Sequence, residues 1–243
     1  MPDVLIFLTA TIDCGQTPHV KRRDPELRRQ DYLKAFRSWL SSDCKADILL
    51  CENSNSDLSD FSELAGTRTL DHSVRLMTFA GNSGAQLKGK GYGEIEMLRH
   101  AFDKFPELMK YRYIIKVTGR YQILNAAKIV GRIRRMKQDL ICDIHNNLTY
   151  GDSFLFAFKP EVALKHLVPY KEDLDELGGV IIEHLVAKCL HLTLAAGGSW
   201  APLPCSPYSD GISGTWDSHL RVGLLERPRR GLKRILAIWI YRR

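Results

Sequence analysis

Residues 4–11 read Val-Leu-Ile-Phe-Leu-Thr-Ala-Thr, and this stretch decides the fold. Five consecutive apolar residues, Val4 to Leu8, are typical of a strand that is buried on both faces. No basic residue precedes the run, and the run is shorter than the hydrophobic region of a secretory signal peptide. We therefore interpret it as the first strand of a buried sheet, which ends at Thr9-Ala10-Thr11.

Similar apolar runs recur along the chain, with helical patterns between them. The first helix is marked by Asp24-Pro25-Glu26, which combines an N-cap residue, a proline at the first helical position and an acid in the first turn. Pro160 marks another helix start, residues 177–190 contain a helical stretch, and 197–217 are rich in Gly, Pro and Ser. Strands are predicted at 46–51, 74–79, 113–117, 140–143 and 154–158, and further helices at 57–64, 94–105 and 125–137.

This alternation predicts an α/β fold: one Rossmann-like domain whose central sheet is mostly parallel and carries helices on both faces. We expect the domain to span residues 1–226, with a separate tail at 227–243. Ligands of such sheets bind where the loops at the carboxyl ends of the strands converge. The relevant loops are 9–24, 52–56, 81–93 and 118–125.

Composition places the excess charge in the tail. The chain has 243 residues and a net charge of +7, and residues 227–243 hold seven basic and no acidic side chains, so residues 1–226 are neutral overall. A generally basic nucleic-acid-coating protein would spread its charge over the folded surface, so that class is disfavoured. A hydrophobic content of 44% excludes a disordered chain, and the sequence has no apolar run long enough for a transmembrane helix. The six scattered cysteines favour a reducing, cytosolic setting without a zinc site.

The segment 81–93 is a glycine-rich loop before a predicted helix. Glycines let a backbone approach a ligand closely, and the free N–H groups of the following helix attract anions. Lys88 and Lys90 add positive charge, which suits a phosphate or diphosphate. The segment matches neither the P-loop nor the dinucleotide-binding pattern. A flexible surface loop with solvated lysines is the alternative.

Thr118-Gly119-Arg120 follows a predicted central strand that carries Lys116. An arginine at this position places a planar cation over the ligand crevice. The alternative is an arginine in a surface ion pair. Two basic loops that face one crevice favour a shared anionic ligand more strongly than either loop does alone.

Three acidic or histidine motifs follow. Glu183-His184 lies in an apolar stretch, where a carboxylate suits a general base or, alternatively, the solvated edge of a helix. Asp173 and Asp175 form an Asp-x-Asp that suits a divalent metal, although it lies in a charge run typical of a solvated turn. His145 is more typical of a structural residue than of a ligand.

Several segments together resemble a family of small bacterial glycosyltransferases from surface-polysaccharide gene clusters. The resemblance covers about residues 4–190 and is specific only as a combination. It is carried, in order, by Leu8-Thr9-Ala10-Thr11-Ile12-Asp13, Arg28-Arg29-Gln30-Asp31-Tyr32-Leu33, Glu52-Asn53-Ser54, Gly89-Lys90-Gly91-Tyr92-Gly93-Glu94, Lys116-Val117-Thr118-Gly119-Arg120-Tyr121 and Ile182-Glu183-His184.

The resemblance implies a nucleotide-sugar-dependent transferase of the A-type fold. Such enzymes commonly end the fourth strand with a metal-binding Asp-x-Asp, and Thr118-Gly119-Arg120 stands there instead. We therefore expect Lys116 or Arg120 to offset the charge of the leaving diphosphate, and we assign no metal ligand. Mg²⁺ or Mn²⁺ stays an option, with Asp173 and Asp175 as its first candidates. The catalytic residues implied are Glu183 as base, Arg120 and His184; the donor-binding residues implied are Thr9, Thr11, Glu52, Asn53, Lys90, Gly91, Glu94, Lys116, Thr118 and Gly119.

The expected reaction is an inverting hexosyl transfer from a nucleotide sugar, with UDP as the expected nucleotide. The resemblance implies a lipid-linked acceptor glycan of an O-antigen, lipopolysaccharide or capsule. In the tail, Leu232, Ile235, Leu236 and Trp239 fall on one helical face, and arginines flank it. That pattern is typical of a helix lying on an anionic membrane surface, so we expect a peripheral protein on the inner face of the cell membrane. A helix docked on the core is the alternative.

Two other functions compete with the transferase. A non-enzymatic protein that binds nucleic acid or an anionic surface would use the tail, residues 21–23 and residues 132–137. The neutral body and the lack of a nucleic-acid-binding motif argue against it, and we expect no nucleic-acid partner. A nucleotidyltransferase on a similar fold would need carboxylates at the strand ends, and Thr118-Gly119-Arg120 supplies none.

Overall fold

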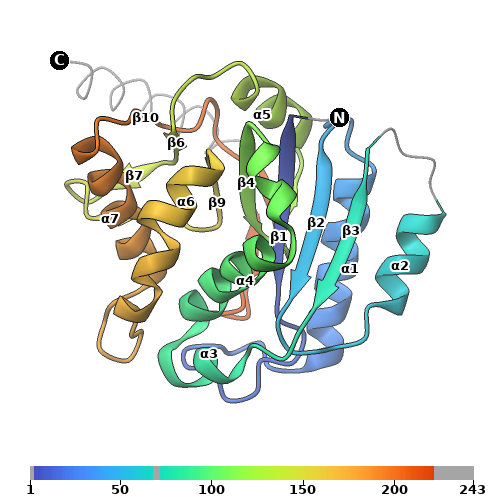
Figure 1. Cartoon of the computed structure of the whole chain (residues 1–243). Coiled ribbons are helices and arrows are strands. Elements are labelled where there is room, and N and C mark those ends of the chain that lie inside the picture. The colour runs from blue at the N-terminus through green and yellow to red at the C-terminus, as the bar shows by residue number, and fades with distance from the viewer. Residues whose placement is uncertain (1–2, 68–71, 222–243) are drawn as a thin grey trace.

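A seven-stranded sheet forms the centre of the computed structural model, which describes residues 3–67 and 72–221 (Figure 1). Its strand order is β10-β6-β9-β4-β1-β2-β3. β9 runs antiparallel to its neighbours β4 and β6, and the other pairs are parallel. The strands are β1 (Val4–Ala10), β2 (Asp47–Glu52), β3 (Val74–Thr78), β4 (Tyr113–Thr118), β6 (Leu140–Ile141), β9 (Leu155–Phe158) and β10 (Trp200–Ala201).

Helices cover both faces of this sheet, as expected (Figure 1). Side chains of β1 alternate between two buried clusters: Ile6 and Leu8 face the first, Leu5 and Phe7 the second. The first cluster contains α1 (Pro25–Leu40), α2 (Ser59–Gly66) and α5 (Ala126–Ile133), and the second contains α4 (Lys90–Lys104), α6 (Pro160–His166) and α7 (Ile182–Ala195). The α/β architecture with a mostly parallel sheet is confirmed.

Helix α1 begins where its sequence signal lies. One carboxylate oxygen of Asp24 accepts hydrogen bonds from the backbone N–H groups of Glu26 and Leu27, at 2.9 and 3.0 Å. Pro25 occupies the first turn, where its missing N–H costs nothing. The entry angle of α1 is thereby fixed, and its residues Arg28 and Tyr32 point back under the loop after β1.

The glycine-rich segment differs from the prediction, because most of 81–93 is helical rather than a loop. The short helix α3 (Ser83–Lys88) is followed by α4, and the two meet at Gly89, whose φ of 104° is favourable only for glycine. Gly91 and Gly93 lie in the first turn of α4, where a Cβ would come within 2.8 Å of Ile182 and 2.9 Å of Asn53. The glycines therefore let α4 pack tightly against its neighbours rather than bend around a ligand.

Residues 197–217, which composition marks only as Gly-, Pro- and Ser-rich, contribute strands. β10 extends the main sheet, and β11 (Ser209–Ile212) pairs with β12 (His219–Arg221) and with β5 (Gln122–Ile123) in a small antiparallel sheet. A second hairpin joins β7 (Ile144–His145) to β8 (Tyr150–Gly151). The shorter helical turns η1 (Pro106–Lys110) and η2 (Val168–Asp173) complete the described elements.

The membrane expectation rests on a segment that the structure does not describe. The tail at 227–243 lies outside the described residues. Within residues 3–67 and 72–221, no helix has the length and apolarity needed to cross a bilayer.

Candidate functional site

A cavity opens at the carboxyl ends of the neighbouring strands β1 and β4, the edge where the loops were expected to converge. The space inside it that is open to a water-sized molecule is about 20 Å³, and the remainder of the hollow is open to solvent. Six predicted site residues line it: Thr9, Thr11, Lys90, Glu94, Thr118 and Arg120. The other lining residues are Cys14, Thr17, Val20, Arg28, Tyr32, Asn82, Ala85 and Met97.

Arg120 is a buried cation that has no ion-pair partner in the described part of the chain. The residue is only 9% exposed, and its Nε and Nη1 atoms are buried with no hydrogen-bond partner among residues 3–67 and 72–221. Its guanidinium lies 5.9 Å from the centre of the Tyr32 ring. Burial lowers the pKa of Arg120, but the surrounding phenols and the carboxylates of Glu94 and Asp31 outweigh this and raise it overall. Leaving donor groups of a charged side chain unpaired is costly, so this arrangement is typical of a site that waits for an anion.

Gly119 lets the end of β4 lie against the end of β1. Its N–H donates to the carbonyl of Thr9 at 2.9 Å, and a Cβ on residue 119 would approach that carbonyl oxygen to 2.7 Å. Thr9 and Thr118 are paired in the register of the two strands. Close packing of the strand ends thus places both threonine side chains at the base of the cavity, next to Arg120.

Arg28, which sequence reasoning did not select, is the second buried cation of the cavity and is 2% exposed. It donates to the carbonyls of Thr11, Ile12 and Arg22 at 2.5–3.2 Å and so holds the loop after β1 in place. Tyr32 helps, because its hydroxyl accepts from the N–H of Thr11 at 3.0 Å. The sequence signal is a basic residue and an aromatic residue at i and i+4 of α1.

The amino terminus of α4, predicted to bind a phosphate, is occupied by a side chain of the protein itself. Glu176 has only 1% of its side chain exposed, and it accepts from the N–H of Gly91 at 2.8 Å. Its second oxygen lies 3.3 Å from Nζ of Lys90. The Lys90 side chain is 31% exposed and also lines the cavity, so its charge is shared between Glu176 and the cavity.

Lys116 lies on the α4 side of β4 and joins three groups. Its ammonium forms an ion pair with Glu94 and donates to Thr118 Oγ1 at 3.2 Å and to the carbonyl of Ser153 at 2.8 Å. Because Lys116 and Glu94 neutralise each other, the pair adds no net charge to the cavity. Lys116 therefore positions Glu94 and Thr118, two lining residues of the cavity.

Glu183 lies in the first turn of α7, beside the cavity rather than in its wall. Its carboxylate accepts a hydrogen bond from the Ser153 hydroxyl at 2.6 Å, and the carbonyl of Ser153 accepts from Lys116. Glu183 is thus three hydrogen-bonded steps from the cavity wall, because Lys116 is not a lining residue and reaches the wall through Glu94 and Thr118. His184 is exposed, and its Nδ1 accepts from the N–H of Ile181 at 3.4 Å at the start of α7.

Glu52 and Asn53 organise the loops around the cavity from behind it. The carboxylate of Glu52 is fully buried and accepts from the backbone N–H groups of Ile12, Ser54 and Ser56, at 2.9–3.0 Å, and from the hydroxyl of Thr78. One side chain therefore ties together the loops after three strands. Asn53 accepts from the Thr11 hydroxyl at 2.6 Å, and its Nδ2 is buried and has no partner among the described residues.

The other motifs lie away from the cavity lining. Lys88 pairs with Glu172 at 2.7 Å. Asp173 pairs with Lys188 at 2.7 Å, and Asp175 accepts from the N–H of Gly178 at 3.0 Å. His145 lies 3.2 Å from Asp152. Over the described residues, no group of three or more His, Cys, Asp or Glu side chains has an arrangement that would hold a metal ion.

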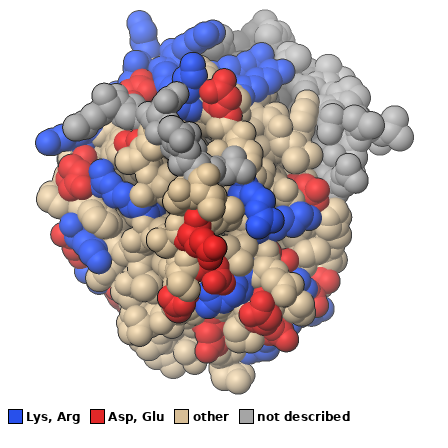
Figure 2. All heavy atoms as spheres, turned by 90° about the vertical axis from the view of Figure 1, so that its right-hand side faces the viewer, with Lys and Arg blue, Asp and Glu red and all other residues tan. Residues whose placement is uncertain are grey.

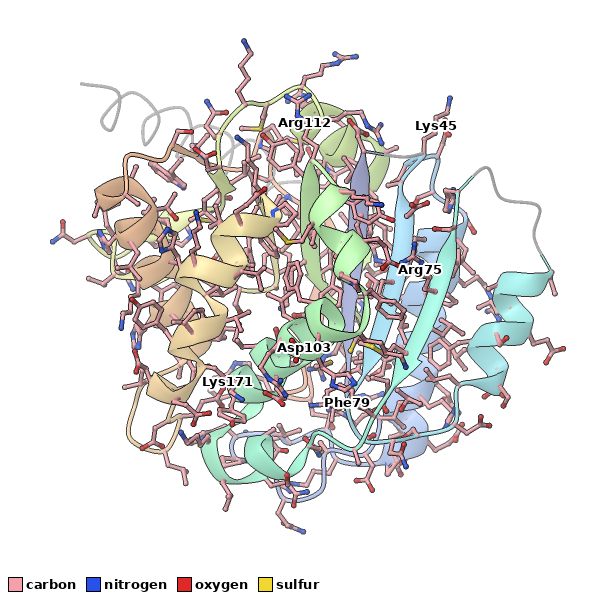
Figure 3. All side chains as sticks on the ribbon, in the orientation of Figure 1. Lys45, Arg75, Phe79, Asp103, Arg112 and Lys171 are labelled. Atoms are coloured by element: carbon pink, nitrogen blue, oxygen red, sulfur yellow. The ribbon has the colours of Figure 1, made fainter. Side chains whose placement is uncertain are left out.

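A second basic region lies at the opposite end of the sheet. Lys and Arg side chains gather at the top of the view in Figure 2, the end at which β1 begins, and Figure 3 labels Lys45 and Arg112 there. Arg134 links this region to Lys45 by donating to its carbonyl at 2.9 Å, and Arg112 donates to the carbonyl of Met136 at 2.8 Å. Residues 1–226 are thus neutral overall, but their charges are unevenly distributed over the fold.

The charge balance of the cavity decides what it can bind. Lys90 has Glu176 and Lys116 has Glu94, whereas neither Arg28 nor Arg120 has a carboxylate within ion-pair distance in the described part of the chain. The charge of two buried guanidiniums, and the two nitrogen atoms of Arg120 that have no partner among the described residues, favour an anion with several oxygen atoms. Phosphate oxygens satisfy this demand.

Comparison with known proteins adds resemblances of shape. No protein-family model and no curated protein sequence matches the chain. Three of the similar solved structures are a candidate nucleotide-diphospho-sugar transferase from Desulfovibrio desulfuricans G20, a mannosyltransferase from Pyrobaculum calidifontis in complex with GDP-Man and Mn²⁺, and a cytidylyltransferase from Leptospira borgpetersenii.

These likenesses are distant. The sequence identities are 11%, 13% and 10%, and the TM-scores are 0.47, 0.48 and 0.47, in the same order. The matches cover 84%, 84% and 91% of this chain, and 80%, 55% and 82% of the other chains. The chain therefore spans about half of the length of the mannosyltransferase. Likenesses at this level assign no activity to the chain.

Proposed function

We propose that this protein is a glycosyltransferase that takes a sugar from a nucleoside-diphosphate sugar, and that the cavity at the ends of β1 and β4 binds the diphosphate. The observation that carries the proposal is Arg120, a buried guanidinium with two unpartnered nitrogen atoms in the cavity wall. Hydroxyls of Thr9, Thr11 and Thr118 and the ammonium of Lys90 line the same cavity. A diphosphate supplies the negative charge and the acceptor oxygens that Arg120 lacks among the described residues.

In the proposed reaction, a hydroxyl oxygen of the acceptor attacks the anomeric carbon of the donor sugar. The new C–O bond forms as the bond to the β-phosphate oxygen breaks, and the nucleoside diphosphate leaves with that electron pair. Arg120 stabilises the charge that develops on the leaving phosphate. The acceptor proton goes to Glu183, held by Ser153 beside the cavity, and attack on the face opposite the leaving group gives inversion.

The identities of donor and acceptor rest on the sequence resemblance and on the tail. We propose UDP as the nucleotide, a hexose as the transferred sugar, and a lipid-linked glycan of a bacterial surface polysaccharide as the acceptor. The basic, amphipathic segment at 227–243 supports a position at the inner face of the cell membrane. Residues 1–226 form the catalytic domain in this proposal.

A resident divalent metal does not fit the residues at the end of β4. Thr118, Gly119 and Arg120 offer no carboxylate there, and the nearest carboxylate that lines the cavity, Glu94, is paired with Lys116. Mg²⁺ and Mn²⁺ prefer carboxylate oxygens, and a guanidinium repels them. We therefore assign no step to a metal, and the diphosphate charge falls to Arg120 and Lys90.

The test is a panel of nucleotides and nucleotide sugars, measured by calorimetry for binding and by release of nucleoside diphosphate for turnover. Binding of at least one nucleoside diphosphate in excess chelator, and its loss in Arg120→Met, supports the proposal. Failure of every diphosphate and nucleotide sugar to bind contradicts it. Binding restored only by Mg²⁺ or Mn²⁺ contradicts the metal-free assignment.

The same samples test the competing function, a binder of nucleic acid or anionic surfaces. The basic region around Lys45, Arg112 and Arg134 is the observation in its favour. A salt-sensitive shift with mixed DNA or RNA, in a protein that binds no nucleotide sugar, would support that function and reject the transferase.

A further inference from the structure

Trp216 is a large aromatic side chain that the proposed reaction does not use. It is 66% exposed, and it is the only aromatic residue among the exposed large hydrophobic side chains of the described residues. It lies in the turn between β11 and β12. Single exposed apolar side chains are common, so exposure alone indicates nothing.

The turn that carries Trp216 is held rigidly. The N–H of Trp216 donates to the Ser213 hydroxyl at 3.2 Å, and the N–H of Asp217 donates to the Ser213 carbonyl at 2.9 Å. The carbonyl of Gly214 accepts from the N–H groups of Lys21 and Arg22 at 2.9 and 3.2 Å. The turn is therefore fastened to the loop after β1, which also lines the cavity.

An ion pair also connects the turn that carries Trp216 to the loop after β1. Nη1 of Arg22 lies 2.9 Å from Asp217, and Nε of the same guanidinium lies 2.5 Å from Asp31 on α1. These ion pairs raise the pKa of Arg22, and the hydrogen bond to Asp31 is the largest cause. An indole ring displayed on such a braced turn loses little conformational entropy when a ligand packs on it.

Trp216 is not a lining residue of the cavity, but the turn that carries it packs against Arg120 in the cavity wall. Gly214 lies directly against Arg120, because a Cβ on residue 214 would come within 2.1 Å of Nη1. Trp216 follows two residues later, which limits the Cα–Cα separation from residue 214 to about 7 Å. From the other side, Val20 lines the cavity, and Nζ of the next residue, Lys21, lies 5.3 Å from the centre of the indole ring.

We propose that Trp216 is the platform on which a pyranose ring of the acceptor glycan stacks. This inference rests on the proposed function. A pyranose presents one apolar face of C–H groups, which packs on an indole, while its hydroxyls need polar partners at the edge. Lys21 and Asp217 supply a donor and an acceptor beside the ring, and the Asp217 side chain is 47% exposed.

The position of the turn favours the acceptor over the base of the nucleotide. The turn contacts the end of β4 through Arg120, and β1 separates β4 from β2. We place the nucleoside at the early part of the loop after β1, where Thr11 meets Asn53, whereas the turn contacts the later part of that loop, at Lys21 and Arg22. A ligand laid across the strand ends with its diphosphate at Arg120 would therefore have its base away from Trp216.

The experiment compares the wild type with Trp216→Ala and Trp216→Phe, and uses Leu194→Ala as the matched control. Leu194 is also exposed, at 46%, but lies near the end of α7. Methyl glycosides of glucose, galactose, mannose and N-acetylglucosamine are titrated by tryptophan emission and by calorimetry, with and without UDP. We expect Trp216→Ala to weaken glycoside binding about tenfold, Trp216→Phe to restore most of it, and UDP affinity to stay unchanged.

Two results would contradict the proposal that Trp216 is the platform for the acceptor sugar. One is a wild type whose emission and heats respond to none of the glycosides. The other is a UDP affinity that falls in Trp216→Ala as much as glycoside affinity does, because the ring would then serve the base. Failure of the proposed function is distinct: the wild type would bind no nucleotide, whereas the titration without UDP would still report on glycoside binding.

Discussion

Arg28 and Arg120 are two buried arginines of one cavity, and they differ in what satisfies them. Arg28 donates to three backbone carbonyls and thus replaces the hydrogen bonds that it would make with water. Arg120 leaves two nitrogen atoms without partners in the part of the chain that the structure describes. The first arginine stabilises the loop after β1, and the second carries a cost to stability that a bound anion would remove.

The two arginines should therefore respond in opposite ways to the same substitution. We expect Arg120→Met to raise the free energy of unfolding, by about 1–2 kcal/mol, while nucleoside-diphosphate binding is lost. Arg28→Met should lower the free energy of unfolding by about 2–4 kcal/mol, because it leaves carbonyls unpaired. Urea denaturation and calorimetry measure both. A large loss of stability in Arg120→Met would show that the residue is structural.

Glu183 is the residue on which the base assignment depends. We expect Glu183→Gln to reduce kcat about a hundredfold or more, with unchanged donor affinity, because the amide can still accept from Ser153 but cannot take a proton. Initial rates and donor calorimetry measure this. Glu161→Gln is the matched control, since Glu161 is an exposed acid in the first turn of α6, as Glu183 is in α7. Full transfer activity in Glu183→Gln would contradict the assignment of Glu183 as the base.

At the residue scale, the position of a polar residue in the chain predicts whether its side chain reaches the cavity. It is a poorer guide to the groups with which that side chain forms hydrogen bonds. Thr9, Thr118 and Arg120 end parallel strands, and strand ends meet at one edge of the sheet, so these residues were predictable. The Glu176 carboxylate at the start of α4 was not, because it lies 85 residues away from Gly91 in the sequence. Arg28 was missed because a basic residue on a helix is more typical of a solvated face.

At the scale of the elements, the strands and the start of α1 were predictable, because their signals are local. The antiparallel direction of β9 was not, because one reversed strand has the same apolar run as a parallel one. The glycines of α4 were misleading: glycine usually ends a helix, yet here contacts with Ile182 and Asn53 require it inside one. For these glycines, tertiary packing overrides the low helix propensity of the residue.

Helix α4 is fixed to the turn η2 through Glu96, which predicts a pH-dependent stability. Glu96 pairs with Arg99 at 2.5 Å and with Lys171, labelled in Figure 3, and these contacts lower its pKa from 4.5 to about 2, the hydrogen bond from Arg99 first. A carboxyl with a lowered folded-state pKa stabilises the fold above its unfolded pKa and loses that contribution as the pH falls toward the folded value.

We therefore expect Glu96→Gln to lower the free energy of unfolding by about 2 kcal/mol at pH 7. The difference from the wild type should shrink between about pH 4.5 and pH 2. Urea denaturation over this pH range measures it. Asp103→Asn is the control, since Asp103 also pairs with Arg99 but is 61% exposed and should cost less than about 0.5 kcal/mol. A difference that does not change with pH would contradict the ion-pair explanation.

At the scale of the whole molecule, the body carries its cavity at the carboxyl ends of the strands and its basic region at their opposite ends (Figures 1 and 2). Composition gave the neutral sum of residues 1–226 but not this separation, which depends on the fold. The position of the tail relative to either end lies outside the described residues.

The tail prediction is tested on the whole chain with vesicles. We expect the full chain to sediment with vesicles that contain phosphatidylserine but not with neutral phosphatidylcholine, since each basic residue near the surface contributes about 1 kcal/mol. A chain that ends at Glu226 should lose most of this binding. If the shortened chain sediments as well as the full chain, the tail is not the anchor. Loss on Lys45→Glu would then assign the binding to the basic region.

The β7–β8 hairpin divides the proposed site between two stretches of the backbone. Arg120 and the cavity lining named above belong to residues before the β7–β8 hairpin, whereas Ser153, Glu176, Glu183 and Trp216 come after it. The hairpin turn at Asn146 and Asn147 is exposed and has positive φ angles of 50° and 53°. A chain cut between these two asparagines would yield two fragments, neither holding both cation and base. Transfer activity should then return only when the two fragments reassemble. This hairpin turn is therefore a suitable place to split the protein for a two-fragment reporter.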